Sequence, residues 1–214
     1  MKNQHQPIAV EGYPFIALFA FITVVFALLG WTVITLLFLV LTLFSVYFFR
    51  NPDRTVPLEK GAVVSPADGK VVFVGTVEEK RLLNCEMIKV SIFMSVFNVH
   101  VNRVPCSGKV IDQFYNKGQF VNAALDKASL ENEQAGMLLE CDNGKPLLVV
   151  QIAGLIARRI VTYPVIGDVL ERGQRFGLIR FGSRLDVYLP TDCKVEVELG
   201  DRCVAGETII GYLA

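Results

Sequence analysis

His100 is the first candidate for chemistry, because histidine is scarce in this chain. The chain has two histidines, and the other one, His5, lies close to the N-terminus. His100 sits in an apolar, strand-like run from Phe93 to Pro105, where an imidazole could act as a general base near neutral pH. The alternative interpretation is a hydrogen-bonded core histidine, which is the more common kind.

Two further groups could act with such a base. Asp68 lies in the turn Ser65-Pro-Ala-Asp-Gly-Lys70, and a carboxylate can hold a histidine in one tautomer and stabilise its charged form. Ser183 follows Gly182 near the C-terminus, and strand-like segments on both sides could hold that bond rigidly in a strained geometry. The alternatives are a turn aspartate and an ordinary Gly-Ser turn.

Arginine and lysine side chains are the candidates for binding anions. Arg158 and Arg159 are adjacent in an apolar segment, and a guanidinium can bind phosphate through two parallel hydrogen bonds. A solvated surface pair is the alternative interpretation of these two arginines. We expect Arg50, Arg54 and Lys60 to face an anionic membrane surface rather than a substrate.

Short β-strands are predicted to position these groups. Runs rich in valine and isoleucine alternate with Gly, Pro, Asp and Asn from residue 61 onward, and this pattern indicates strands joined by turns. The clearest runs are residues 70–74, 87–93, 147–152 and 194–198. We therefore expect a mainly β domain over residues 61–214.

Internal repeats refine this prediction. Pro66-Ala-Asp-Gly-Lys-Val71 recurs as Pro105-Cys-Ser-Gly-Lys-Val110 and, more loosely, as Pro190-Thr-Asp-Cys-Lys-Val195. Gly167-Asp-Val-Leu-Glu-Arg-Gly173 recurs as Gly200-Asp-Arg-Cys-Val-Ala-Gly206. Together these elements resemble the half-motifs of lipoyl- and biotinyl-type β-sandwich barrels, a duplicated hybrid motif. The alternative is that both are common turn chemistry.

The N-terminal segment predicts a membrane anchor over residues 1–50. No charged residue occurs between Glu11 and Arg50, and this apolar stretch exceeds the roughly 20 residues of one span. Because Gly30 and Trp31 interrupt it, we expect a transmembrane helical hairpin with helices at about 15–29 and 32–49, followed by a linker over 51–60. One long tilted helix is the alternative. Basic residues on both sides of the hairpin predict that the domain faces the cytoplasm at the cell membrane.

Composition excludes some functions. The formal net charge is zero, so no nucleic-acid partner is expected. The five cysteines are odd in number and lack any CxxC pair, so the sequence indicates neither a disulfide framework nor a metal site. We expect scattered core cysteines.

Asp68, His100 and Gly182-Ser183, in this order and behind an apolar anchor, resemble the phosphatidylserine decarboxylase family. The resemblance runs from Phe48 to the C-terminus and includes Arg50-Asn-Pro-Asp-Arg54. In that family an aspartate, a histidine and a serine form a triad, and the chain cuts itself at a Gly-Ser bond. Many members read Gly-Ser-Thr, whereas Arg184 follows the serine here, as in the short form of the family.

This resemblance implies a lyase that decarboxylates phosphatidylserine to phosphatidylethanolamine in phospholipid biosynthesis. Ser183 would become a pyruvoyl cofactor that binds the substrate amine as a Schiff base, with His100 as base and Asp68 orienting it. The carbonyl is an electron sink for the carbanion left by CO₂, so neither pyridoxal phosphate nor a metal is needed. Self-cleavage would yield a large chain, 1–182, and a small chain, 183–214, which remain partners. A homo-oligomer is compatible with the sequence.

Two other classes of protein remain as alternatives. A non-enzymatic membrane-anchored adaptor of the lipoyl-like kind would explain the anchor and the repeats, although no sustained heptad pattern accompanies them. A pyruvoyl decarboxylase of a soluble amino acid would explain the triad but gives no reason for an anchor. An ether-linked serine phospholipid is also compatible with the sequence as substrate.

Overall fold

The computed structural model describes residues 6–118, 132–154, 159–180 and 183–213. The chain divides into two compact units, Met1–Asp53 and Arg54–Ala214.

The N-terminal unit consists of apolar helices. A short 3₁₀ turn, η1 (Val10–Gly12), leads into α1 (Tyr13–Leu28), and α2 (Thr32–Phe48) follows after a turn in which Gly30 has a positive φ of 74°. The ring of Phe38 in α2 lies against the rings of Phe19 and Phe26 in α1. Each helix lies within two residues of its predicted range at both ends.

One helical stretch in the described part of the chain, Val10–Leu28, is long and apolar enough to cross a membrane. Thr32–Phe48 is a shorter apolar helix. These helices support membrane association, and the transmembrane hairpin itself stays a prediction.

The second unit is mainly β, as predicted. Its strands, in chain order, are β1 (Ala62–Val64), β2 (Gly69–Glu79), β3 (Cys85–Met94), β4 (Val101–Arg103), β5 (Gly108–Asn116), β6 (Gln134–Cys141), β7 (Pro146–Ala153), β8 (Ile160–Thr162), β9 (Val169–Leu170), β10 (Arg175–Ile179), β11 (Ser183–Leu189), β12 (Lys194–Val195), β13 (Arg202–Cys203) and β14 (Ile209–Tyr212).

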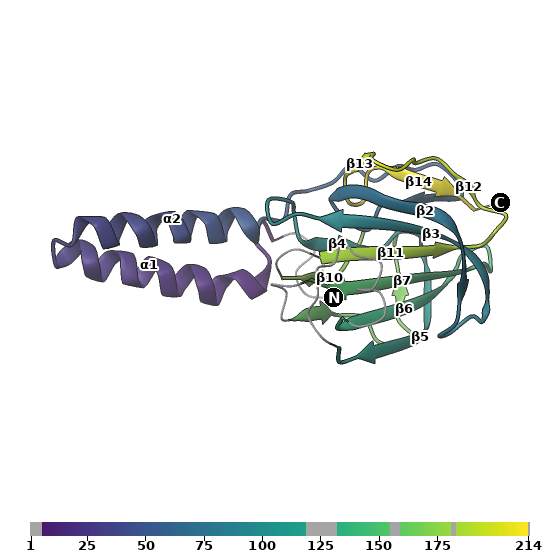
Figure 1. The fold of residues 1–214 in the computed structure, drawn as a ribbon, viewed down its shortest axis with the longest axis horizontal. Coiled ribbons are helices and arrows are strands. Elements are labelled where there is room, and N and C mark those ends of the chain that lie inside the picture. The colour runs from purple at the N-terminus through teal and green to yellow at the C-terminus, as the bar shows by residue number, and fades with distance from the viewer. Residues whose placement is uncertain (1–5, 119–131, 155–158, 181–182, 214) are drawn as a thin grey trace. The chain divides into compact units, whose positions relative to one another are not determined.

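These strands form three antiparallel sheets. The largest has the order β13-β2-β3-β11-β7-β6-β5-β9 and curls into a half-barrel (Figure 1). The two small sheets have the orders β1-β14-β12 and β4-β10-β8. Buried aliphatic side chains such as Ile92, Leu139 and Leu185 form the main core, and a second cluster around Leu148 lies on the other face of the large sheet. The likeness to lipoyl-type barrels stays a prediction.

The sequence repeats occupy equivalent places in the large sheet. Gly69 and Gly108 begin the long strands β2 and β5, and a Cβ on either glycine would lie 2.3 Å from a carbonyl oxygen of the next strand. Each long strand has a bulge directly after the valine of its repeat. Each also pairs at its start with a two-residue strand from a Gly-Asp repeat, β13 on β2 and β9 on β5. The repeats therefore mark a structural duplication.

The expectation of five scattered core cysteines without a disulfide is wrong, because Cys106 and Cys141 form a disulfide and Cys85 is exposed. Cys106 lies in the turn before β5, and Cys141 ends β6 opposite Gly108. Strand register brings the two sulfurs together across 35 residues of sequence, so cysteine spacing alone gives no sign of the pair. Cys85, Cys193 and Cys203 are free thiols.

Candidate active site

Ser183 is fully buried at the first position of β11. This strand lies between β3 and β7, and Ser183 pairs with Met94 on one side and with Ala153 on the other. Because side chains alternate along a strand, Ser183 points to the same face as the core residues Leu185, Val187 and Leu189. Its hydroxyl donates to Met94 Sδ across 3.5 Å. The serine therefore sits in an apolar setting with a weak hydrogen-bond acceptor.

His100 lies directly before β4 and is 2% exposed. β4 pairs antiparallel with β10, with Val101 opposite Leu178, and β10 ends at Ile179, just before the segment that leads to Ser183. The His100 Nδ1 atom is 2.9 Å from the carbonyl oxygen of Asn98. Since a carbonyl accepts, Nδ1 carries the proton, and Nε2 is the basic nitrogen of the neutral ring. In this tautomer Nε2 is the nitrogen that can accept a proton, and the role of His100 as a base stays a prediction.

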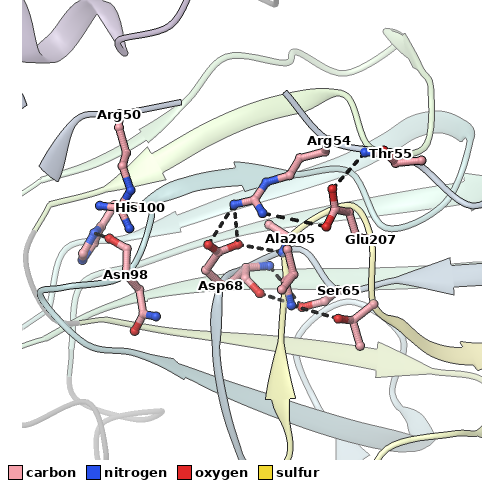
Figure 2. Close-up of polar contacts among 12 residues, drawn as sticks. Arg50, Arg54, Thr55, Ser65, Asp68, Asn98, His100, Ala205 and Glu207 are labelled. Carbon is pink, nitrogen blue, oxygen red and sulfur yellow. Dashed lines mark hydrogen bonds and ion pairs between the residues drawn. The ribbon is translucent and has the colours of Figure 1, made fainter. Parts of the chain in front are cut away.

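Asp68 occupies the turn between β1 and β2, close to the strand that follows His100. The backbone N–H of Arg103 in β4 donates to the carbonyl of Pro66 in this turn across 2.9 Å. The Asp68 carboxylate itself accepts from Arg54 Nη2 at 2.8 and 3.0 Å and from the backbone N–H of Ala205 at 2.8 Å (Figure 2). Its described hydrogen bonds thus go to Arg54 and Ala205, and its role toward His100 stays a prediction.

Arg54, which we expected from the sequence to face the membrane surface, instead lies beside Asp68. Its side chain is 11% exposed, because it lies between the carboxylates of Asp68 and Glu207, whose nearest contacts are 2.8 and 4.0 Å away. The backbone N–H of Thr55 also donates to Glu207 (Figure 2). The surface prediction for Arg54 is therefore wrong. The sequence did not reveal this ion pair, because Asp68 is 14 residues away from Arg54 and comes close to it only through the fold of the chain.

The linker after Arg54 is also fixed to the β unit. Gly173 has a φ of +79°, and a Cβ there would lie 2.3 Å from the side chain of Val56. The Arg172 guanidinium donates to three backbone carbonyls of this region, those of Pro57, Glu59 and Ala62. Residues 54–62 therefore pack as part of the β unit rather than as a free connection.

A competing nucleophile lies near the Asp68 turn. Burial raises the pKa of the Cys203 thiol to about 11, so this group is a neutral thiol at neutral pH. A thiol in that state is a poor nucleophile, and the role of Ser183 as nucleophile stays a prediction.

Arg184 follows Ser183 on the opposite face of β11. Its Nε lies 2.8 Å from Asp186 Oδ1, and the two side chains are 3% and 0% exposed. Removal of one partner from a buried ion pair leaves an unpaired buried charge, which strongly destabilises a protein. Substitution of either Arg184 or Asp186 alone is therefore expected to destabilise the β unit. The arginine that follows the serine is thus held by a carboxylate of its own strand.

The remaining predicted site residues are only partly covered. Gly182 and Arg158 lie outside the described residues. Arg159 is exposed, and its carbonyl accepts from the backbone N–H of Arg180, which places it near the end of β10 that leads to Ser183. Among the described residues, no group of three or more His, Cys, Asp or Glu side chains could hold a metal ion.

The sequence that contains these residues matches the model of an enzyme family. The sequence model of the phosphatidylserine decarboxylase family matches residues 41–211, a range that contains Asp68, His100 and Ser183. The chain belongs to the phosphatidylserine decarboxylase family. This confirms the resemblance drawn from those three residues, and the family is one of carboxy-lyases rather than of non-enzymatic adaptors.

Full-length relatives agree with the family match. The phosphatidylserine decarboxylase proenzyme of Syntrophotalea carbinolica is 68% identical over 213 residues, with all of both chains covered. Those of Geotalea uraniireducens and Geobacter sulfurreducens are 60% and 55% identical, again over the whole of both chains. The similarity to these phosphatidylserine decarboxylase proenzymes therefore includes the apolar N-terminal segment.

Proposed function

We propose that the chain decarboxylates phosphatidylserine to phosphatidylethanolamine with a pyruvoyl group made from Ser183. The observation that carries the proposal is that Ser183 is buried at the start of β11 in a member of this family. The preceding strand, β10, pairs with β4, which directly follows His100. Decarboxylation leaves an electron pair on the substrate Cα. The carbonyl of a pyruvoyl group would form an imine with the substrate amine, and this imine would delocalise the electron pair.

Self-cleavage at Gly182-Ser183 would create this group. His100 Nε2 accepts the hydroxyl proton while Ser183 Oγ attacks the Gly182 carbonyl, and the peptide bond becomes an ester. Loss of the Ser183 Cα proton then breaks the Cβ–Oγ bond and leaves dehydroalanine, which hydrolyses with release of ammonia. The hydrogen bond from Nδ1 to Asn98 supports this role, because it keeps Nε2 basic.

The surroundings of Ser183 fit a pyruvoyl group. Conversion removes Oγ and turns Cβ into a methyl group, and the hydroxyl of Ser183 now donates to the thioether sulfur of Met94. A methyl group packs well against a thioether, whereas a polar or charged lining would favour the serine. The site thus suits the product of processing as well as the serine.

The small chain 183–214 would remain bound after cleavage from the large chain 1–182. β11, its first element, pairs with β3 along Ser183–Leu189 and with β7 along Ser183–Tyr188. The core side chains on one face of β11 add to this hold. The two chains therefore form one catalytic β unit over residues 61–214. Because the pyruvoyl carbonyl is itself the electron sink, no metal or pyridoxal phosphate is required.

The lipid substrate explains an anchor at the cell membrane. An anchored enzyme meets phosphatidylserine at a high effective concentration. Lys2, Arg50 and Lys60 support a cytoplasmic location for the catalytic unit, with both helices of the anchor in the membrane. The exposed Arg159, near the end of β10, is a candidate for the lipid phosphate together with Arg158.

The mass of the purified protein tests this function. We expect two chains, residues 1–182 and 183–214, with the small chain blocked to N-terminal sequencing because its first residue has lost its amine. A single chain of 214 residues from membranes that actively form phosphatidylethanolamine would contradict the proposal.

A further inference from the structure

Ser183 and Asn102 share one buried hydrogen-bond acceptor. The hydroxyl of Ser183 in β11 and the amide nitrogen of Asn102 in β4 both donate to Met94 Sδ in β3, at 3.5 and 3.7 Å. All three side chains are fully buried. The amide of Asn102 is therefore a buried polar side-chain group close to Ser183, with a single sulfur atom between them.

Two further side chains hydrogen-bond in series with this amide. The Thr162 hydroxyl in β8 donates to Gln151 Oε1 across 2.7 Å, and the NH₂ group lies at the other end of the Gln151 amide. That NH₂ group donates to Asn102 Oδ1 across 2.8 Å. Since Oδ1 is thereby used as an acceptor, and the thioether of Met94 can accept but not donate, the NH₂ group of Asn102 faces Met94.

The sheet leaves room for this row of amides. Gly177 in β10 lies opposite Thr162, and a Cβ there would lie 2.1 Å from the carbonyl oxygen of Val161 in β8 and 3.1 Å from Gln151 Nε2. A side chain at this position would press on the Gln151 amide. The row Thr162, Gln151, Asn102 and Met94 thus joins β8, β7, β4 and β3 into one directed chain of hydrogen bonds that ends beside Ser183.

The Asn102 donor is poorly satisfied where it stands. A thioether is a weak acceptor, and buried amide donors in proteins nearly always have an oxygen partner. A buried donor held in a fixed direction toward a reactive group is well placed to meet negative charge that develops there. Met94 is flexible, so it can move aside when Ser183 becomes an ester.

We propose that the Asn102 NH₂ group donates a hydrogen bond to the oxygen that leaves Ser183 Cβ during processing. The inference rests on the proposed self-cleavage. In this step the Ser183 Cα proton goes to the general base, and its electron pair forms the Cα=Cβ bond. The Cβ–Oγ electron pair leaves with Oγ, which becomes part of the Gly182 carboxylate. The Asn102 donor stabilises this oxygen as it gains charge.

Asn102→Leu removes the donor and keeps a similar volume, so the ester should accumulate. Loss of one such donor slows the step it serves by about a hundredfold or more. Hydroxylamine cuts esters, so it should release from the variant a small chain that begins with an unmodified serine and can be sequenced. The wild-type small chain should be blocked. A blocked small chain formed by Asn102→Leu at the wild-type rate would overturn the inference.

A structural role for Asn102 would give a different result. If the side chain only supports the fold, the variant should stay uncut and resist hydroxylamine, because the ester never forms; this outcome also overturns the inference. If the wild-type chain itself gives no blocked small chain, the proposed function fails instead. The two failures are therefore distinguishable.

Thr162→Val tests the same donor in case Asn102→Leu does not fold. The change removes the hydrogen bond to Gln151 Oε1, so the Gln151 and Asn102 amides are held less firmly and some ester should accumulate. The matched control is Thr76→Val, at an exposed position of β2, which should process like the wild type. Thr162→Val processing at the wild-type rate without any hydroxylamine-sensitive chain would overturn the inference.

Discussion

Ser183→Ala should yield a single chain of 214 residues with no decarboxylase activity. The variant lacks both the nucleophile that cuts the chain and the atoms that form the pyruvoyl carbonyl. The fold should persist, because the lost hydroxyl donates to a thioether, a weak acceptor, and the loss leaves little empty space. Gel electrophoresis, intact mass and phosphatidylethanolamine formation from phosphatidylserine vesicles measure these outcomes.

Ser91→Ala is the matched control for this experiment. Ser91 is another buried serine, on β3 opposite Asp186. It has no assigned role in processing, so its alanine variant should be cut and active. Cleavage of Ser183→Ala at the same place would show that another group is the nucleophile.

His100→Ala should slow self-cleavage by about 10²- to 10⁴-fold, the usual contribution of a general base. Asp68→Asn should have a smaller effect, because the Asp68 carboxylate bonds to Arg54 and to the N–H of Ala205. The rate at which the 214-residue chain disappears after synthesis in a cell-free system measures both effects. His5→Ala, which changes the only other histidine, is the control.

The reverse order of these two effects would contradict the assigned roles. If His100→Ala cuts itself at the wild-type rate, another group is the base. If Asp68→Asn is the more damaging change, the ion pair with Arg54 matters more to processing than the imidazole does.

Local sequence patterns predicted much of this fold. The runs at 70–74, 87–93 and 147–152 lie within β2, β3 and β7, because valine and isoleucine between turn residues favour strands. The repeats predicted equivalent turns, and the close approach of backbone at Gly69 and Gly108 explains why glycine recurs there. Hydropathy likewise located both N-terminal helices.

Contacts between distant strands could not be predicted in this way. The Arg54–Asp68 ion pair, the Cys106–Cys141 disulfide and the Asn102–Met94 contact each depend on strand register or on a turn that folds back. Register is set by the packing of whole sheets, and a single sequence does not show which residues face one another. His100 and Ser183 were identified because their types are rare or reactive, whereas Asn102 and Gln151 have no such signal.

Borohydride trapping tests most directly whether Ser183 becomes the group that holds the substrate. Borohydride added with phosphatidylserine should reduce the linkage between the substrate amine and the enzyme, and so fix the lipid covalently. We predict that the lipid is found on the small chain, at residue 183, and that activity is lost in parallel. Lipid fixed to a lysine of the large chain, or full activity without any adduct, would contradict the account.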